Sequence, residues 1–223
     1  MGFWKNRIWG IVFWLGGCPL MAQNGFFEPN IGQISVPEHI QSGKPLAVFH
    51  HPLGQVYIAE DRLRIRLIKP EDKPLIHQSF HYRDRDSAFH IRSQVFDIIF
   101  DEALKPDDVI FENPAPYYLN YYLGNNPDLW RPQVYPFQRV ILKNLYRKID
   151  LNVYIINGQV EFDWVLNPGS NPEDIQMRFS GQDKLDLNKN KIQLTGENAQ
   201  FSIAPPVAYR KKRFKKRPAK PIS

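Results

Sequence analysis

Apolar and polar residues alternate with a period of two along much of the chain after residue 23. In residues 63–68, Leu63, Ile65 and Leu67 alternate with arginines, as in a β-strand that has one buried face. No segment keeps a helical period over three turns. The pattern predicts strands at residues 47–50, 56–59, 63–68, 87–100, 139–142, 149–156, 159–166, 175–179, 192–194 and 200–203.

Turn residues separate these runs. Asn157-Gly158 lies between two alternating segments and predicts a two-residue type I′ hairpin, because both central residues must accept a positive φ. Residues 167–172 (NPGSNP) predict a second turn. Many short strands with prolines between them are typical of an all-β, antiparallel, sandwich-like domain. We expect an ordered, aromatic-rich loop at residues 120–135, the longest stretch without a clear period.

The first residues have the composition of an export signal. Lys5 and Arg7 precede the apolar residues 8–15, and this run is too short to span a bilayer as a helix. We expect residues 1–23 to be removed and the remainder to be secreted or displayed at the cell surface; the other interpretation is a buried N-terminal helix. Leu15-Gly-Gly-Cys18 also resembles a lipobox, so acylation of Cys18 is the alternative to soluble release, and it is the only route by which we expect membrane attachment.

The cysteine count and the charge distribution limit the kinds of site and partner that the chain can have. Cys18 is the only cysteine, so residues 24–209, the predicted single β-rich domain, have no disulfide and no cysteine metal site. The chain carries a net charge of +6, but eight positive residues lie in the predicted disordered tail, residues 210–223, and two lie in the signal. The domain itself holds 19 positive and 23 negative residues, and we expect no nucleic-acid partner.

Several phrases keep the order that they have in a known family. They are residues 27–33 (FEPNIGQ), 120–124 (NYYLG) with Trp130, 145–151 (LYRKIDL), 161–169 (EFDWVLNPG), 175–181 (IQMRFSG) and 205–209 (PPVAY). In these phrases the chain resembles the uncharacterised N-terminal domain of proteins secreted by the type IX system. Those proteins often continue into SBBP β-propeller repeats, PKD-like domains and a gliding-motility-type sorting tail.

The resemblance implies a secreted, β-rich module without known catalytic residues, so no functional positions carry over. The family continues after the phrase at 205–209 with further strands, whereas this chain turns into the basic segment 210–217. We therefore expect a fragment of a larger secreted protein, produced by truncation or by a frameshift, that lacks edge strands at its C-terminal end; a short stand-alone protein is the alternative.

Two sets of side chains are candidates for catalytic or metal-binding groups. Glu161 and Asp163 share one strand face, and glycoside hydrolases use two carboxyl groups about 5–9.5 Å apart. Such a pair normally flanks the sugar from opposite sides, so a solvated strand face is the favoured interpretation and hydrolysis the alternative. His77 and His81 would lie about 13 Å apart on a strand, and neither belongs to an HExxH motif. We assign no catalytic, cofactor or metal residues.

The aromatic residues near the middle of the chain are dense enough to form either a packed loop core or a platform for stacking on sugars, and we favour the core. They are Tyr117, Tyr118, Tyr121, Tyr122, Trp130 and Tyr135. The leading hypothesis is a non-catalytic structural or adhesive module that contacts a surface polysaccharide or protein, with the ligand-binding residues unknown. The alternatives are a carbohydrate-binding or carbohydrate-hydrolysing domain and binding of polyanions by the basic tail.

Overall fold

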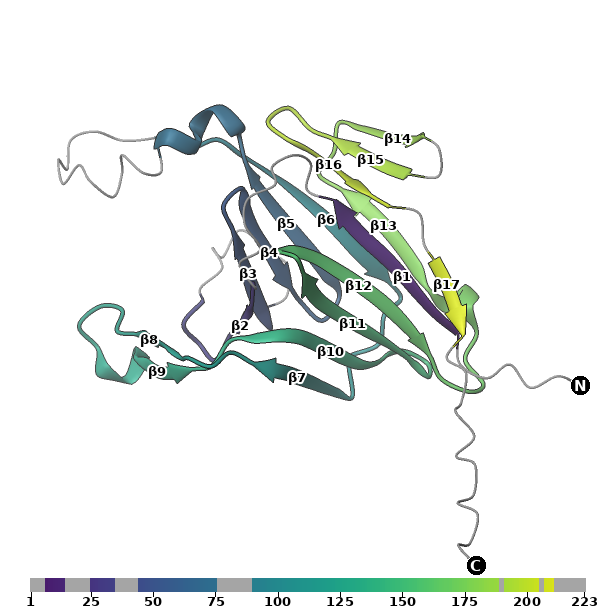
Figure 1. Cartoon of the computed structure of the whole chain (residues 1–223), viewed down its shortest axis with the longest axis horizontal. Coiled ribbons are helices and arrows are strands. Elements are labelled where there is room, and N and C mark those ends of the chain that lie inside the picture. The colour runs from purple at the N-terminus through teal and green to yellow at the C-terminus, as the bar shows by residue number, and fades with distance from the viewer. Residues whose placement is uncertain are drawn as a thin grey trace, which may run out of the picture.

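The computed structural model describes residues 7–14, 25–34, 44–75, 90–188, 191–204 and 207–210, and it is almost entirely antiparallel β-structure (Figure 1). The main sheet runs in the order β13 (Gln176–Ser180), β6 (Ser93–Asp101), β5 (Arg62–Ile68), β4 (Gly54–Ile58), β3 (Ala47–His51), β2 (Phe27–Pro29), β10 (Phe137–Tyr146), β11 (Ile149–Ile156), β12 (Gln159–Leu166), β1 (Arg7–Trp14), β16 (Gln200–Ile203), β15 (Lys191–Thr195) and β14 (Lys184–Asn188). Two further strands pair with it, β7 (Asp108–Pro114) with β10 and β17 (Val207–Arg210) with β1.

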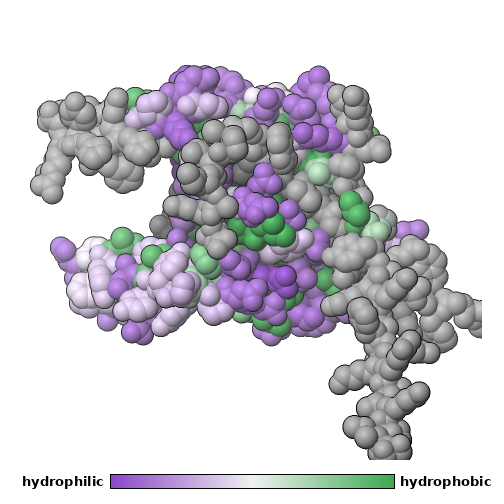
Figure 2. Space-filling view, in the orientation of Figure 1, coloured by the Kyte–Doolittle hydropathy of each residue, from purple (hydrophilic) through white to green (hydrophobic). Residues whose placement is uncertain are grey.

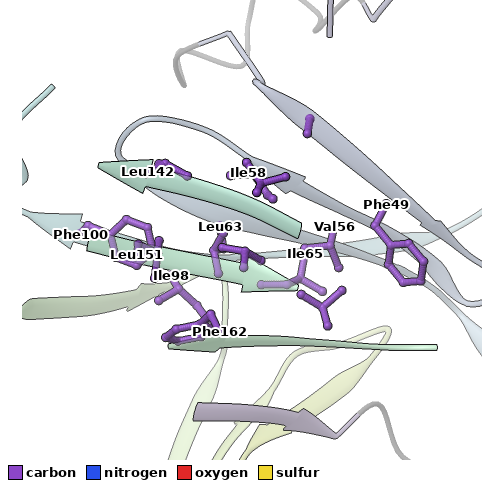
Figure 3. Packing of buried hydrophobic residues seen from close by; sticks show 14 of the residues in the cluster. Phe49, Val56, Ile58, Leu63, Ile65, Ile98, Phe100, Leu142, Leu151 and Phe162 are labelled. Carbon is purple, nitrogen blue, oxygen red and sulfur yellow. The ribbon is translucent and has the colours of Figure 1, made fainter. Parts of the chain in front are cut away.

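The main sheet curls so that its two halves face each other. Strand β2 has three residues and joins β10 through a single residue pair, Phe27 with Phe137, so the sheet bends there. Strands β3–β6 and β13 form one layer, and β10–β12 form the other (Figure 1). Leu142 and Leu151 of the second layer face Leu63 and Ile98 of the first across the core (Figure 3). The predicted all-β, sandwich-like fold is confirmed.

Strand β5 shows why the alternating pattern gives this core. Its residues are alternately half-buried and buried, with Leu63, Ile65 and Leu67 inside. The arginines on the opposite face are not simply solvated. Arg64 makes two hydrogen bonds of 2.7 Å to the buried carboxylate of Asp97, and Arg62 adds a third of 3.2 Å. On its outer face, β5 is therefore held to β6 by charge-assisted hydrogen bonds as well as by the backbone hydrogen bonds of the sheet.

The two predicted turns are confirmed. Asn157 and Gly158 have φ values of 52° and 74°, and they join β11 to β12 with Ile156 opposite Gln159. In the turn at residues 167–172, the backbone N–H of Ser170 donates to the carbonyl of Asn167 at 3.0 Å. Both turns fix the ends of β12, which carries the candidate carboxylates.

A buried carboxylate holds an irregularity between β10 and β11. The register shifts between Leu142 and Tyr146, where Asn144 has a φ of 51°. The backbone N–H of Asn144 donates to Asp150 at 2.9 Å, and the ammonium group of Lys143 pairs with the same carboxylate. The hydroxyl of Tyr146 lies 3.0 Å and 2.8 Å from the carbonyl oxygens of Asp101 and Gln176, so this segment also contacts the facing layer.

Some strand predictions were wrong or incomplete. Residues 87–100 were predicted as one strand, but β6 begins at Ser93, and residues 76–89 lie outside the described part of the chain. The pattern missed β2, β7, β14 and β17. Residues 120–135, predicted as a loop, contain strand structure at both ends. Within the predicted export signal, Arg7–Trp14 forms β1; Cys18 and the tail beyond Arg210 lie outside the described residues.

Candidate functional site

A two-stranded hairpin separate from the main sheet carries the aromatic residues. Strands β8 (Leu119–Tyr121) and β9 (Arg131–Val134) pair with each other, and a 3-10 turn, η2 (Pro127–Leu129), lies between them. Figure 1 shows this hairpin projecting from the body at the side of β2. We call residues 117–135 the aromatic arm.

The base of the arm is fixed to the segment around β2. The hydroxyl of Tyr121 donates to the carboxylate of Glu28, which also lies 3.7 Å from His50. Burial, and then this hydrogen bond, raise the pKa of Tyr121 above its ordinary range. Arg131 donates from Nε to the carbonyl of Ile31 at 2.9 Å. The arm is therefore attached through residues that lie about a hundred positions apart in the sequence.

The tip of the arm has its own hydrogen bonds. The side chain of Asn126 accepts from the backbone N–H of Asp128 at 3.0 Å and caps η2. The indole of Trp130 donates to the carbonyl of Gly124 at 3.3 Å, and Arg131 reaches the carbonyl of Asp128 at 2.6 Å. These bonds fix the tip without burying its side chains.

The aromatic rings of the arm are at the surface. Tyr122 and Trp130 meet edge to face at 5.4 Å between ring centres, and Tyr118 meets Tyr135 at 5.7 Å. Figure 2 shows pale and green residues gathered over this projection. Five of the six candidate aromatics are 37% to 59% exposed, namely Tyr117, Tyr118, Tyr122, Trp130 and Tyr135. The predicted packed loop core is therefore wrong for these five; only Tyr121 is partly buried.

The candidate carboxylates lie elsewhere, on the outer face of β12. Glu161 stands opposite Tyr154 of β11 and is half-buried, and Asp163 is buried. Burial raises the pKa of the Glu161 carboxyl, and the charge of Asp163 adds to this, against a hydrogen bond with Tyr154. Arg139 lies over the Tyr154 ring at 5.6 Å and pairs with Glu112 at 3.2 Å. The solvated strand face that the sequence favours is wrong for Asp163, because this residue is buried.

A cavity of about 390 Å³ lies at another end of the fold. It forms between residues that follow β5 and the turn that joins β15 to β16, and it has both polar and apolar walls. Its lining includes Lys69, Glu71, Glu197, Asn198 and Gln200. Neither Glu161 nor Asp163 lines it, so this cavity does not bring the two carboxylates to a substrate.

Metal and membrane features can be judged only for the described residues. His77 and His81 lie outside them, and within them no group of three histidine, cysteine or acidic side chains is placed to hold a metal ion. Across the same residues, no helix is long and apolar enough to cross a bilayer.

A protein-family model described as a domain of unknown function (DUF7948) matches residues 27–220. The chain belongs to this family. The DUF7948 match begins at the first residue of β2, after the predicted export signal, and it extends into the basic segment. Strand β1 is thus outside the match. Neither the curated proteins nor the solved structures contain a match to the chain.

The residues that hold the arm in place were missed by sequence reasoning. Glu28 and Arg131 have no local pattern that marks them, because their partners, Tyr121 and Ile31, are distant in sequence. Of the sequence-predicted groups, the structure brings together Tyr122 with Trp130 and Tyr118 with Tyr135, and it keeps both pairs apart from the carboxylates of β12.

Proposed function

We propose that this DUF7948 domain is a non-catalytic interaction module that binds an extracellular polymer through the aromatic arm. One observation carries the proposal: large rings stand half-exposed on a projecting hairpin whose base is fixed by Tyr121–Glu28 and Arg131–Ile31. Exposed rings held in fixed positions lose little conformational freedom when a ligand covers them, which favours binding.

The composition of the tip supports a polysaccharide as the ligand. The faces of Tyr122 and Trp130 offer apolar surface for stacking, and both residues are exposed. Asn125, Asn126 and Asp128 lie beside them, also exposed, with short polar side chains that can hydrogen-bond hydroxyl groups. A surface protein can also present apolar groups next to hydroxyl groups, as a polysaccharide does. Such a protein is the second class of ligand.

The proposed place of action is outside the cytoplasm. It rests on the signal-like residues 1–23 and on the resemblance to domains of type IX-secreted proteins. We propose that the domain is secreted or displayed at the cell surface as a fragment of a larger protein, with lipid attachment through Cys18 as the alternative.

An array of polysaccharides and extracellular matrix proteins tests the binding proposal. The chain should bind at least one of them, and the double variant Tyr122→Ser/Trp130→Ser should lose that binding. Leu187→Ser is the control, because Leu187 is a large apolar residue that is more exposed than either ring (72% against 59% and 37%) and lies on β14, outside the arm. Binding of nothing on the array would refute the proposal, as would equal binding by the double variant.

Glycoside hydrolysis is the second candidate, favoured by one observation. The pKa of Glu161 is raised, as it is in a general acid, and the buried carboxylate of Asp163 lies next to it on the strand. The variants Glu161→Gln and Asp163→Asn should then abolish release of reducing sugar from a polysaccharide panel. Absence of turnover by the unmodified chain, or full turnover by either variant, would dismiss it.

A further inference from the structure

Strand β1 lies within the main sheet, although its residues precede the part of the chain that matches the family model. It pairs with β12 over residues 8–12, with β17 over residues 7–10 and with β16 over residues 13–14. Figure 1 shows it in dark purple beside β12 and below β16. The segment lies before residue 27, where the DUF7948 match begins, and within the predicted export signal.

The hydrogen-bonding edge of β12 that faces β1 can be identified from the hairpin. In a two-residue hairpin the flanking pair, here Ile156 and Gln159, exchanges both backbone hydrogen bonds, and bonding then alternates along the strand. The backbone groups of Val160, Phe162, Trp164 and Leu166 therefore point toward β1. Removal of β1 would leave this edge unpaired.

The residues of β12 and β16 that pair with β1 also belong to the hydrophobic core. Trp9 and Ile11 stand opposite Trp164 and Phe162 in the register, and Phe13 stands opposite Ile203. The β12 and β16 residues of these pairs are buried parts of the main cluster. A long, apolar edge strand left open in this way is prone to pair with another chain.

We propose that this position, the β12 acceptor site, is a strand-binding site that takes an extended strand from a partner polypeptide once the signal is removed. This rests on the export proposal above. The partner strand must run antiparallel to β12, cover about eight residues, and carry apolar side chains at the alternate positions opposite Phe162 and Trp164. Such strand addition takes its affinity from main-chain hydrogen bonds and its specificity from alternate side chains.

Segments at the C-terminal end of the chain fit the acceptor site poorly. Strand β17 has four residues, half the length of β12, and it runs antiparallel to β1, so in its present place it is parallel to β12. The basic run at residues 210–217 has one apolar residue, Phe214, and lacks the alternation that the site requires. Neither segment matches the site in both length and pattern, and the occupant that we propose is a strand from another polypeptide.

The test uses the chain exported with its own signal, and its mass first shows whether residues 7–14 have been removed. The probe is a synthetic peptide of residues 6–15 with three added lysines; the matched control carries an N-methyl group on the Ile11 nitrogen, which removes one N–H directed at β12. Hydrogen exchange is measured on the β12 amides of Phe162 and Trp164, which point toward β1 within the paired register, with the uncleaved chain as reference.

In the processed chain these amides should exchange at least tenfold faster than in the uncleaved chain. The unmodified peptide should restore protection and the N-methyl peptide should not. Protection already complete in a monomer, protection through a dimer of the chain, or no effect of the peptide would each overturn the proposal. Retention of residues 7–14 would overturn it too, while leaving binding by the aromatic arm untouched.

Discussion

The hydroxyl of Tyr121 donates a hydrogen bond to the carboxylate of Glu28, and this contact joins the aromatic arm to strand β2. The two residues are 93 positions apart in the sequence. The contact fixes the base of the arm near the bend of the main sheet. The arm can therefore present exposed rings in a constant orientation although its tip packs against little of the core.

Loss of this contact should loosen the arm. Tyr121→Phe removes one hydrogen bond to a carboxylate, worth about 1.5–3 kcal/mol. The arm, residues 117–135, should then be cut faster by a protease at native conditions, while the main sheet stays intact. Tyr118→Phe is the control, since Tyr118 is an exposed ring in contact with Tyr135. Equal cleavage of both variants would show that Glu28 does not hold the arm.

Asp150 should be among the most important polar residues for stability. Asp150→Ala leaves the Asn144 N–H and the Lys143 ammonium group without their acceptor. Because the Lys143 side chain is 37% exposed and water can solvate it, the loss should be about 1–3 kcal/mol. Urea unfolding measures the change. Asp186→Ala, which breaks the solvent-accessible pair of a half-exposed carboxylate with Lys184 on β14, should cost less than about 1 kcal/mol. A small effect at Asp150 would contradict the role assigned to it at the irregularity in β10.

Two glycines form a matched pair for backbone strain. Both have a positive φ, but a Cβ at Gly54 would lie 1.8 Å from the backbone oxygen of Arg66, whereas a Cβ at Gly124 meets nothing within 4 Å. Gly54→Ala should therefore lower the free energy of unfolding by about 3 kcal/mol or more, and Gly124→Ala by about 1–2 kcal/mol. Urea unfolding measures both changes. Equal losses of unfolding free energy in the two variants would contradict the close contact of β4 with β5 at Gly54.

Acid should weaken the domain partly through Asp72. Hydrogen bonds from Arg92 lower the pKa of this buried carboxyl from 3.8 to about 2. Because the folded pKa lies below the unfolded one, the contribution is complete above about pH 4 and is lost as the pH falls toward 2. The difference in unfolding free energy between the unmodified chain and Asp72→Asn should thus shrink from pH 5 to pH 2. A constant difference would contradict this.

The sequence predicted the regular parts of this fold well. Alternation placed β5, β11 and β12, and Asn157-Gly158 identified the hairpin, because each depends only on neighbours in the chain. Strand β2 escaped notice since three residues cannot show a period. The exposure of the arm could not be predicted, because composition is the same for a buried and a projecting aromatic hairpin. Its orientation depends on Glu28 and Ile31, whose contacts are distant in sequence.

The most direct test of arm-mediated binding is calorimetric titration with the strongest ligand found on the polymer array. The unmodified chain is compared with Tyr122→Ser, Trp130→Ser and the control Leu187→Ser. Truncation of a ring that anchors a ligand costs about 1–2 kcal/mol or more, so each arm variant should raise Kd about tenfold at unchanged stability, while the control keeps the Kd of the unmodified chain. Equal Kd values for all four proteins would contradict binding through the aromatic arm.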